Sequence, residues 1–233
     1  MKPHPTALVL AAALAAASLP AAAKFDMDAI ATYYRTPDPQ LKRGLRITDQ
    51  TMADPISEQA SVRVNLSVWA AYILAKQPQQ TMDWCAALQK HSAAKIAPVF
   101  KMADTPDSGR CLAQLKLSGK DRASVGRIPT AAELLAGPIT PVSLDGRWAA
   151  FYATGKAQYV EEIAAYVADN AGMLQEKSKR SGKSTAEIAT FGSARWSLVS
   201  NMEQYPEIRR IVEKYAATLP AAKRKALEKE LAD

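Results

Sequence analysis

Three stretches of the chain decide its fold: WAAYILAKQPQQTMDWCAAL at 69–88, WAAFYATGKAQYVEEIAAYV at 148–167 and WSLVSNMEQYPEIRRIVEKY at 196–215. Each begins with a tryptophan in a helical pattern, passes a proline or glycine, and continues as a second helical pattern. A large apolar residue stands fifteen positions after each tryptophan. The sequence therefore predicts three helical hairpins of one type.

The three leading tryptophans, Trp69, Trp148 and Trp196, are expected to form the core of this repeat by packing against the returning helices. One hairpin cannot bury both of its faces, so consecutive hairpins must stack. The tryptophans are unevenly spaced along the chain, which argues against a regular solenoid. We expect an all-α fold, an irregular array of stacked antiparallel helical hairpins.

Other segments support an all-helical reading. The apolar positions between Ser57 and Lys76 surround most of the helix, as in a central, buried helix. Thr130 with Glu133 and Ser184 with Glu187 have the spacing of a capping box, in which each side chain bonds the other residue's backbone N–H. Alternation typical of strands is nowhere sustained.

The proline- and glycine-rich stretch 128–146 is the predicted internal boundary. We expect an N-terminal helical subdomain at 24–127, a connector at 128–146 and C-terminal helical hairpins at 147–233. With 48% hydrophobic and 23% charged residues, the chain has the composition of a globular protein.

Residues 1–23 have the pattern of a cleavable signal peptide. Lys2 precedes a charge-free apolar stretch, and Ala21-Ala22-Ala23 offers the small residues that signal peptidase recognises. The apolar stretch is shorter than the roughly 20 residues of a membrane span. We therefore expect a mature chain from Lys24, no transmembrane anchor, and a periplasmic or secreted location.

The chain has two cysteines, Cys85 and Cys111. In an oxidising compartment an isolated pair favours one structural disulfide, worth about 3 kcal/mol in the chain-entropy model. Two buried thiols are the alternative. A redox CxxC motif is absent from the sequence.

The turn from Gly155 to Tyr159, followed by Ile163 and Ala164, resembles the turn between the two helices of a tetratricopeptide-type repeat. The resemblance covers Trp148 to Asn170 only. Its tryptophan and tyrosine stand at different distances from the glycine than in that family, so it implies a helical hairpin and no specific ligand. The residues around Trp148 and Trp196 also resemble exported proteobacterial helical proteins of unassigned function, which implies no site residues.

Catalytic residue types are scarce. Removal of the signal would leave one histidine, His91, in a polar stretch near a helix end, so neither a zinc site nor a Ser-His-Asp arrangement is favoured. Gly182-Lys183-Ser184 imitates the end of a phosphate-binding loop, but Lys177 stands where the first glycine is needed. We therefore expect no catalytic residue, no metal and no cofactor.

Carboxylate pairs could in principle hydrolyse glycosidic bonds. None has a sequence context that places one acid in an apolar pocket, as a general acid needs. Solvated helix faces are the simpler interpretation. The candidates are Glu161, Glu162, Asp83, Glu203 and Glu207.

These observations together favour an exported, non-enzymatic protein that binds another macromolecule in the cell envelope, with an immunity or inhibitor protein as one specific version. The net charge of +7 indicates a solvated basic face, or else binding to an anionic envelope surface or to an acidic partner. Export would separate the chain from nucleic acid, so a protein partner is expected. The alternative is a cell-wall glycoside hydrolase that uses an unrecognised carboxylate.

Overall fold

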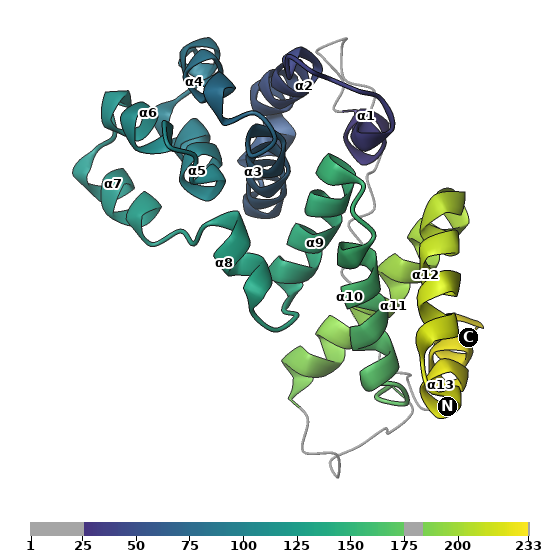
Figure 1. The fold of residues 1–233 in the computed structure, drawn as a ribbon. Helices are drawn as coiled ribbons and strands as arrows, with labels where there is room; N and C mark the ends of the chain where they lie inside the picture. Colours follow the sequence, from purple (N-terminus) through teal and green to yellow (C-terminus); the bar gives the residue numbers. More distant parts are fainter. Residues whose placement is uncertain (1–25, 175–183, 233) are drawn as a thin grey trace, which may run out of the picture.

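The computed structural model describes residues 26–174 and 184–232, and in these residues every regular element is a helix (Figure 1). The predicted all-α class is confirmed. The proposed signal peptide at 1–23 and the Gly182-Lys183 pair lie outside the described residues.

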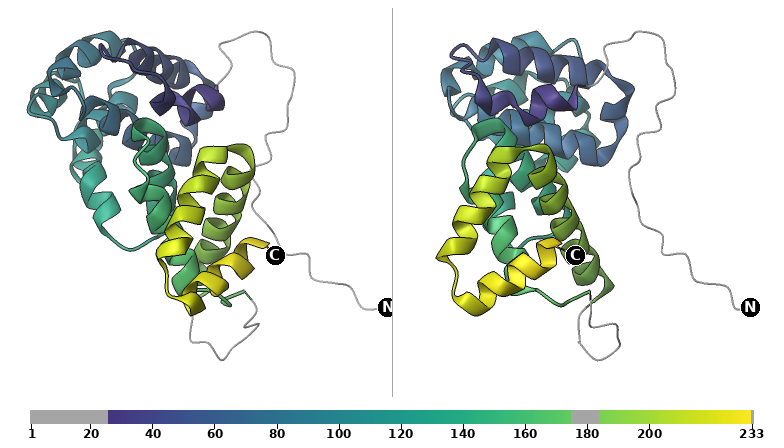
Figure 2. Two further views of the ribbon diagram at one scale, coloured as in Figure 1. Left: turned by 45° about the vertical axis from the view of Figure 1, so that its right-hand side comes forward. Right: turned by 90° about the vertical axis from the view of Figure 1, so that its right-hand side faces the viewer.

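The N-terminal elements gather at one end of the molecule and the C-terminal helices at the other (Figures 1 and 2). The first group contains α1 (Met27–Ala31), η1 (Tyr33–Arg35), α2 (Lys42–Ala53), η2 (Pro55–Glu58), α3 (Ala60–Leu74), η3 (Pro78–Gln80), α4 (Thr81–Leu88), α5 (Ala93–Ala103), α6 (Ser108–Gln114) and α7 (Gly119–Gly126). The second contains α8 (Ala131–Ala136), α9 (Pro141–Thr154), α10 (Gln158–Asp169), α11 (Thr185–Gln204), α12 (Pro206–Thr218) and α13 (Ala221–Ala232).

Helix α3 lies at the centre of the first core, as its pattern predicts. It packs against α5 on one side and α9 on another. Trp69, Ile73 and Leu74 are all fully buried. Because neighbours cover α3 on several sides, its apolar residues surround the helix instead of forming a single stripe.

Helix α9 joins the two apolar cores. Ala149 and Ala153 belong to the N-terminal core, whereas Trp148 and Phe151 belong to the core of α10–α13. Gly146, near the start of α9, lies against α8. A Cβ atom there would stand 3.0 Å from Leu135 Cδ2, so a glycine allows the close approach of the two helices.

The stretch 128–146 contains helix α8 and the first turns of α9. The predicted capping box of Thr130 and Glu133 is present at the start of α8, and that of Ser184 and Glu187 at the start of α11. Both predictions were possible because a capping box is a local signal that needs no tertiary contact.

The predicted disulfide between Cys85 and Cys111 is confirmed. It joins α4 to α6 with an Sγ–Sγ distance of 2.10 Å, and both cysteines are fully buried. The bond crosslinks two short helices that lie beside α5 in the N-terminal group.

The predicted repeat core is wrong at its third position. Trp69 and Trp148 are 1% and 6% exposed, but Trp196 is 70% exposed. The buried side of α11 carries Phe191, Ala194 and Leu198. At 100° per residue, Trp196 falls on the side of the helix opposite to this apolar stripe, so it cannot pack into the core.

Candidate functional site

The exposed side of α11 carries the first candidate site. Trp196 is flanked one turn away by Gly192, Ser193 and Ser200, which are small, and Leu174 approaches Gly192 and is itself 41% exposed. We call these five residues the Trp196 surface. Trp196 is 70% exposed, and within the described residues its indole makes no hydrogen bond and no ring contact.

Helix α11 holds the Trp196 surface in a fixed position. On one side, Ser197 Oγ accepts a hydrogen bond from Trp148 Nε1 at 3.0 Å. On the other, Arg195 Nε donates to the backbone oxygen of Glu230 at 2.6 Å, and the Glu230 carboxylate accepts from Gly172 N at 2.7 Å. The helix is therefore anchored on both flanks, and a partner would meet a surface whose shape is already set.

A second candidate is the cleft between η1, α10 and α12, which we call the Tyr34–Glu207 cleft. Three segments far apart in sequence meet here, because α9 packs against η1, the turn at Gly155 leads from α9 into α10, and α10 packs against α12. A Cβ atom on Gly155 would stand 2.7 Å from the Tyr34 ring, and the φ of Gly155 is +70°, so the turn favours glycine. The lining residues are Tyr34, Phe151, Gly155, Ala157, Glu161, Glu207, Arg210, Ile211 and Lys214.

Glu207 is the most constrained charged group of this cleft. Its Oε1 accepts hydrogen bonds from the Tyr34 hydroxyl at 2.5 Å and from Arg35 Nε at 2.7 Å. Burial alone would raise the pKa of Glu207, but these donors and the Arg35 charge outweigh it and hold the pKa below its usual value. Burial and the bond to Glu207 raise the pKa of Tyr34 to about 12. At neutral pH the pair is therefore a carboxylate and a protonated phenol.

The structure brings two of the five carboxylate candidates together: Glu161 and Glu207 line the same cleft. The other three lie elsewhere. Glu162 pairs with Arg147 at 2.7 Å, while Asp83 and Glu203 are exposed on α4 and α11. Since the pKa of Glu207 is lowered, its side chain suits a base or a fixed charge and not a proton donor.

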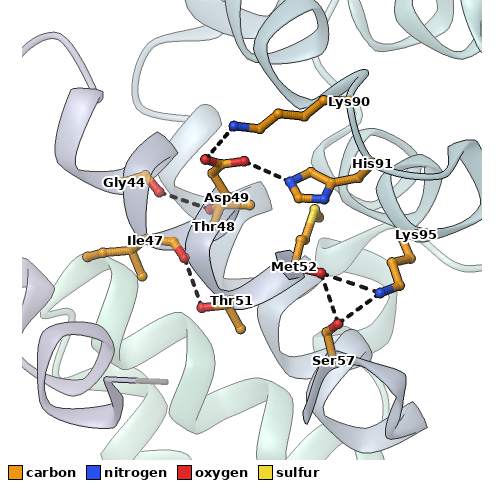
Figure 3. A network of polar contacts seen from close by, with 10 residues as sticks. All are labelled: Gly44, Ile47, Thr48, Asp49, Thr51, Met52, Ser57, Lys90, His91 and Lys95. Atoms are coloured by element: carbon orange, nitrogen blue, oxygen red, sulfur yellow. Dashed lines mark hydrogen bonds and ion pairs between the residues drawn. The ribbon is translucent and has the colours of Figure 1, made fainter. Parts of the chain in front are cut away.

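His91 connects the turn before α5 to helix α2 (Figure 3). Its Nε2 lies 2.7 Å from Asp49 Oδ1, and Lys90 Nζ donates to Asp49 Oδ2 at 2.8 Å. Burial opposes the charge on Asp49, but these hydrogen bonds outweigh it and hold the pKa of Asp49 below its usual value. In the described part of the chain no serine hydroxyl is hydrogen-bonded to His91. The contact joins two helical segments.

Acidification should weaken this contact. The pKa of Asp49 is lower in the folded chain than the roughly 3.9 of an unfolded aspartate. Its stabilising effect is therefore complete above about pH 5 and is lost as the pH falls through the folded pKa. Asp49→Asn should lower the free energy of unfolding at pH 7 by about 0.5–1 kcal/mol, allowing for solvent screening, and flatten its decline below about pH 4.

Urea unfolding at a series of pH values measures this effect. Asp83→Asn, which changes an exposed carboxylate on α4, is the matched control and should keep the wild-type pH dependence. Equal slopes for wild type and Asp49→Asn would contradict the assignment.

A broad groove with a volume of about 790 Å³ lies between η2, α3, α5, α7, α8 and the start of α9. Its lining is mostly apolar, and the charged groups at its edge include the Lys95–Glu58 ion pair. The apolar lining residues are Ala60, Val64, Ala94, Pro98, Met102, Val125, Ile128, Pro129, Leu134 and Val142. The lining also contains charged residues of both signs, so the groove does not favour a ligand of one charge.

Within residues 26–174 and 184–232, no group of three or more histidine, cysteine or acidic side chains is arranged to hold a metal ion. In the same ranges, none of the helices combines the length and the apolar character that crossing a membrane requires. Comparisons with family models, with curated proteins and with solved structures found no match to this chain.

Proposed function

We propose that this protein is exported to the cell envelope and acts there without catalysis, by binding another protein through the Trp196 surface. The observation that carries the proposal is the exposure of Trp196 on an anchored helix. Tryptophan is enriched among the residues that contribute most to protein–protein binding, because one rigid side chain buries a large area. The small residues around it would let a partner approach the helix closely.

An immunity or inhibitor protein is the specific version that we favour, because such a protein needs a preformed docking surface and no active site. The predicted signal peptide supports a location in the periplasm or outside the cell. The disulfide supports an oxidising compartment.

Site-specific photocrosslinking tests the proposal. A photoreactive phenylalanine analogue placed at position 196, in cells that produce the protein, should crosslink to one defined protein. The matched control is the same analogue at Met27, an exposed apolar position on α1. Trp196→Ala should then weaken binding of the purified partner by about 2 kcal/mol or more, as at other interface hot spots. Equal crosslinking from both positions, or wild-type affinity of Trp196→Ala, would refute the proposal.

The alternative function is glycoside hydrolysis of the cell wall, and the meeting of Glu161 and Glu207 in one cleft favours it over other enzymatic functions. It predicts that the purified protein releases soluble fragments from peptidoglycan, and that Glu161→Gln and Glu207→Gln each abolish the release. Arg209→Gln, which changes a residue outside this cleft, should leave the release unchanged.

A further inference from the structure

We propose that the Tyr34–Glu207 cleft binds an acidic polypeptide segment, with Arg210 and Lys214 as the groups that recognise its carboxylates. This site is separate from the Trp196 surface, since no residue of α11 lines the cleft. The inference therefore goes beyond the proposed function and does not depend on it.

The first step concerns which charges of the cleft are already neutralised. Glu207 is paired with Arg35, whose guanidinium also lies 5.9 Å from the centre of the Tyr34 ring and 5.5 Å from that of Tyr205. This pair is held between η1 and α12 by hydrogen bonds and ring contacts. The negative charge of Glu207 and the positive charge of Arg35 therefore neutralise each other and contribute little to the attraction of a charged ligand.

The second step concerns the charges that remain. Among the described residues, neither Arg210 nor Lys214 has an acidic partner or a hydrogen bond from its side chain, and both are exposed. Glu161 is the single remaining negative charge of the lining. The unpaired groups therefore carry a net positive charge and favour an anionic ligand.

The third step concerns the shape of that ligand. Arg210 and Lys214 stand one helical turn apart on α12, about 6 Å along its axis. Side chains two residues apart in an extended segment lie on the same side and are separated by about 7 Å. Two carboxylates in an acidic-x-acidic sequence would therefore match the two cations, while the half-buried apolar side chain of Ile211 contacts the backbone and the intervening residue.

Replacing Glu161 provides a second test, because its expected effect on affinity is opposite to that of removing the cations. It faces the same cleft from α10 and would repel an acidic segment. Glu161→Gln should therefore tighten binding, whereas removal of the cations should weaken it. A purely structural role of these side chains predicts neither change.

Fluorescence anisotropy with the labelled peptide Ser-Glu-Ser-Glu-Ser measures the binding, and the Ser-Gln-Ser-Gln-Ser peptide is the ligand control. Arg210→Gln/Lys214→Gln should weaken binding by about tenfold or more, since two charge-assisted hydrogen bonds are lost. Arg209→Gln/Arg224→Gln removes the same charge from residues that line a different groove, and should change the affinity by about twofold or less. Trp196→Ala should bind the peptide like the wild type.

Three results would overturn the proposal. One is equal binding of the glutamate and glutamine peptides. Another is an equal loss of affinity in the two double variants, which would indicate only long-range attraction to a basic protein. The third is binding to vesicles that contain anionic lipid, lost in Arg210→Gln/Lys214→Gln, without any binding of the glutamate peptide, which would assign these cations to a lipid surface.

Discussion

Replacing Arg147 by alanine is expected to lower the free energy of unfolding by about 3–5 kcal/mol, because backbone oxygens lose their donors at about 1–3 kcal/mol each and a large buried side chain is removed. Arg147 is 5% exposed although it is charged. Its Nε donates to Glu162 Oε2 at 2.7 Å, and its Nη2 donates to the backbone oxygens of Leu135 at 2.9 Å and Gly137 at 3.1 Å. Those oxygens are at the end of α8, where a helix has no internal donors left.

Arg147 therefore caps α8 and joins it to α9 and α10 at the same time. Without the guanidinium, buried carbonyl oxygens lose their donors and a cavity remains. Glu162→Gln is the matched control. Glu162 is 41% exposed, and a glutamine there keeps an oxygen that can accept from Arg147, while Arg147 keeps its backbone acceptors, so this change should cost about 1 kcal/mol or less. Urea unfolding followed by circular dichroism measures both variants, and similar values for the two would contradict this account.

The elements that could be predicted from sequence are those set by local patterns. Apolar spacing indicates α3 as a buried helix, and the spacing of Thr130 and Glu133 places the start of α8. The disulfide was predictable for a different reason, because two cysteines allow only one intramolecular pair.

The contacts that build the candidate cleft could not be predicted in the same way. Tyr34 and Glu207 are 173 residues apart in sequence and meet only after α9, α10 and α12 have packed. Arg147 was missed for a related reason. In sequence it is one charged residue at the edge of an apolar run, and its burial depends on the carbonyl ends of α8, which only the tertiary fold brings beside it.

The burial of Trp196 was predicted wrongly although a local signal was present. The alignment of the three hairpin sequences treats Trp196 as equivalent to Trp69 and Trp148. Such an alignment does not determine which side of each helix faces the core. Phe191, Ala194 and Leu198 have the i, i+3, i+7 spacing of a buried stripe, and Trp196 lies outside it. Within one helix this stripe is a better guide than similarity between segments.

The second large effect on stability is expected from replacing the buried Trp148 by alanine, and the exposed Trp196 gives the comparison. Trp148→Ala should lower the free energy of unfolding by about 3–5 kcal/mol, because it empties a buried site between α9 and α11. The Trp148 ring stacks on Tyr152 with ring centres 6.0 Å apart, and its Nε1 donates to Ser197. Trp196→Ala removes the same side chain from the solvent-facing side of α11 and should change stability by about 0.5 kcal/mol or less.

Chemical unfolding of the two alanine variants, with wild type measured in parallel, compares the same substitution in the two environments. The expected difference between the two variants is about 2.5 kcal/mol or more. This comparison also bears on the binding test. If Trp196→Ala is folded and stable, a loss of affinity for the partner must come from the missing surface contact and not from unfolding. A loss of stability in Trp196→Ala as large as in Trp148→Ala would show that the indole packs against the chain, and would leave α11 without its exposed docking residue.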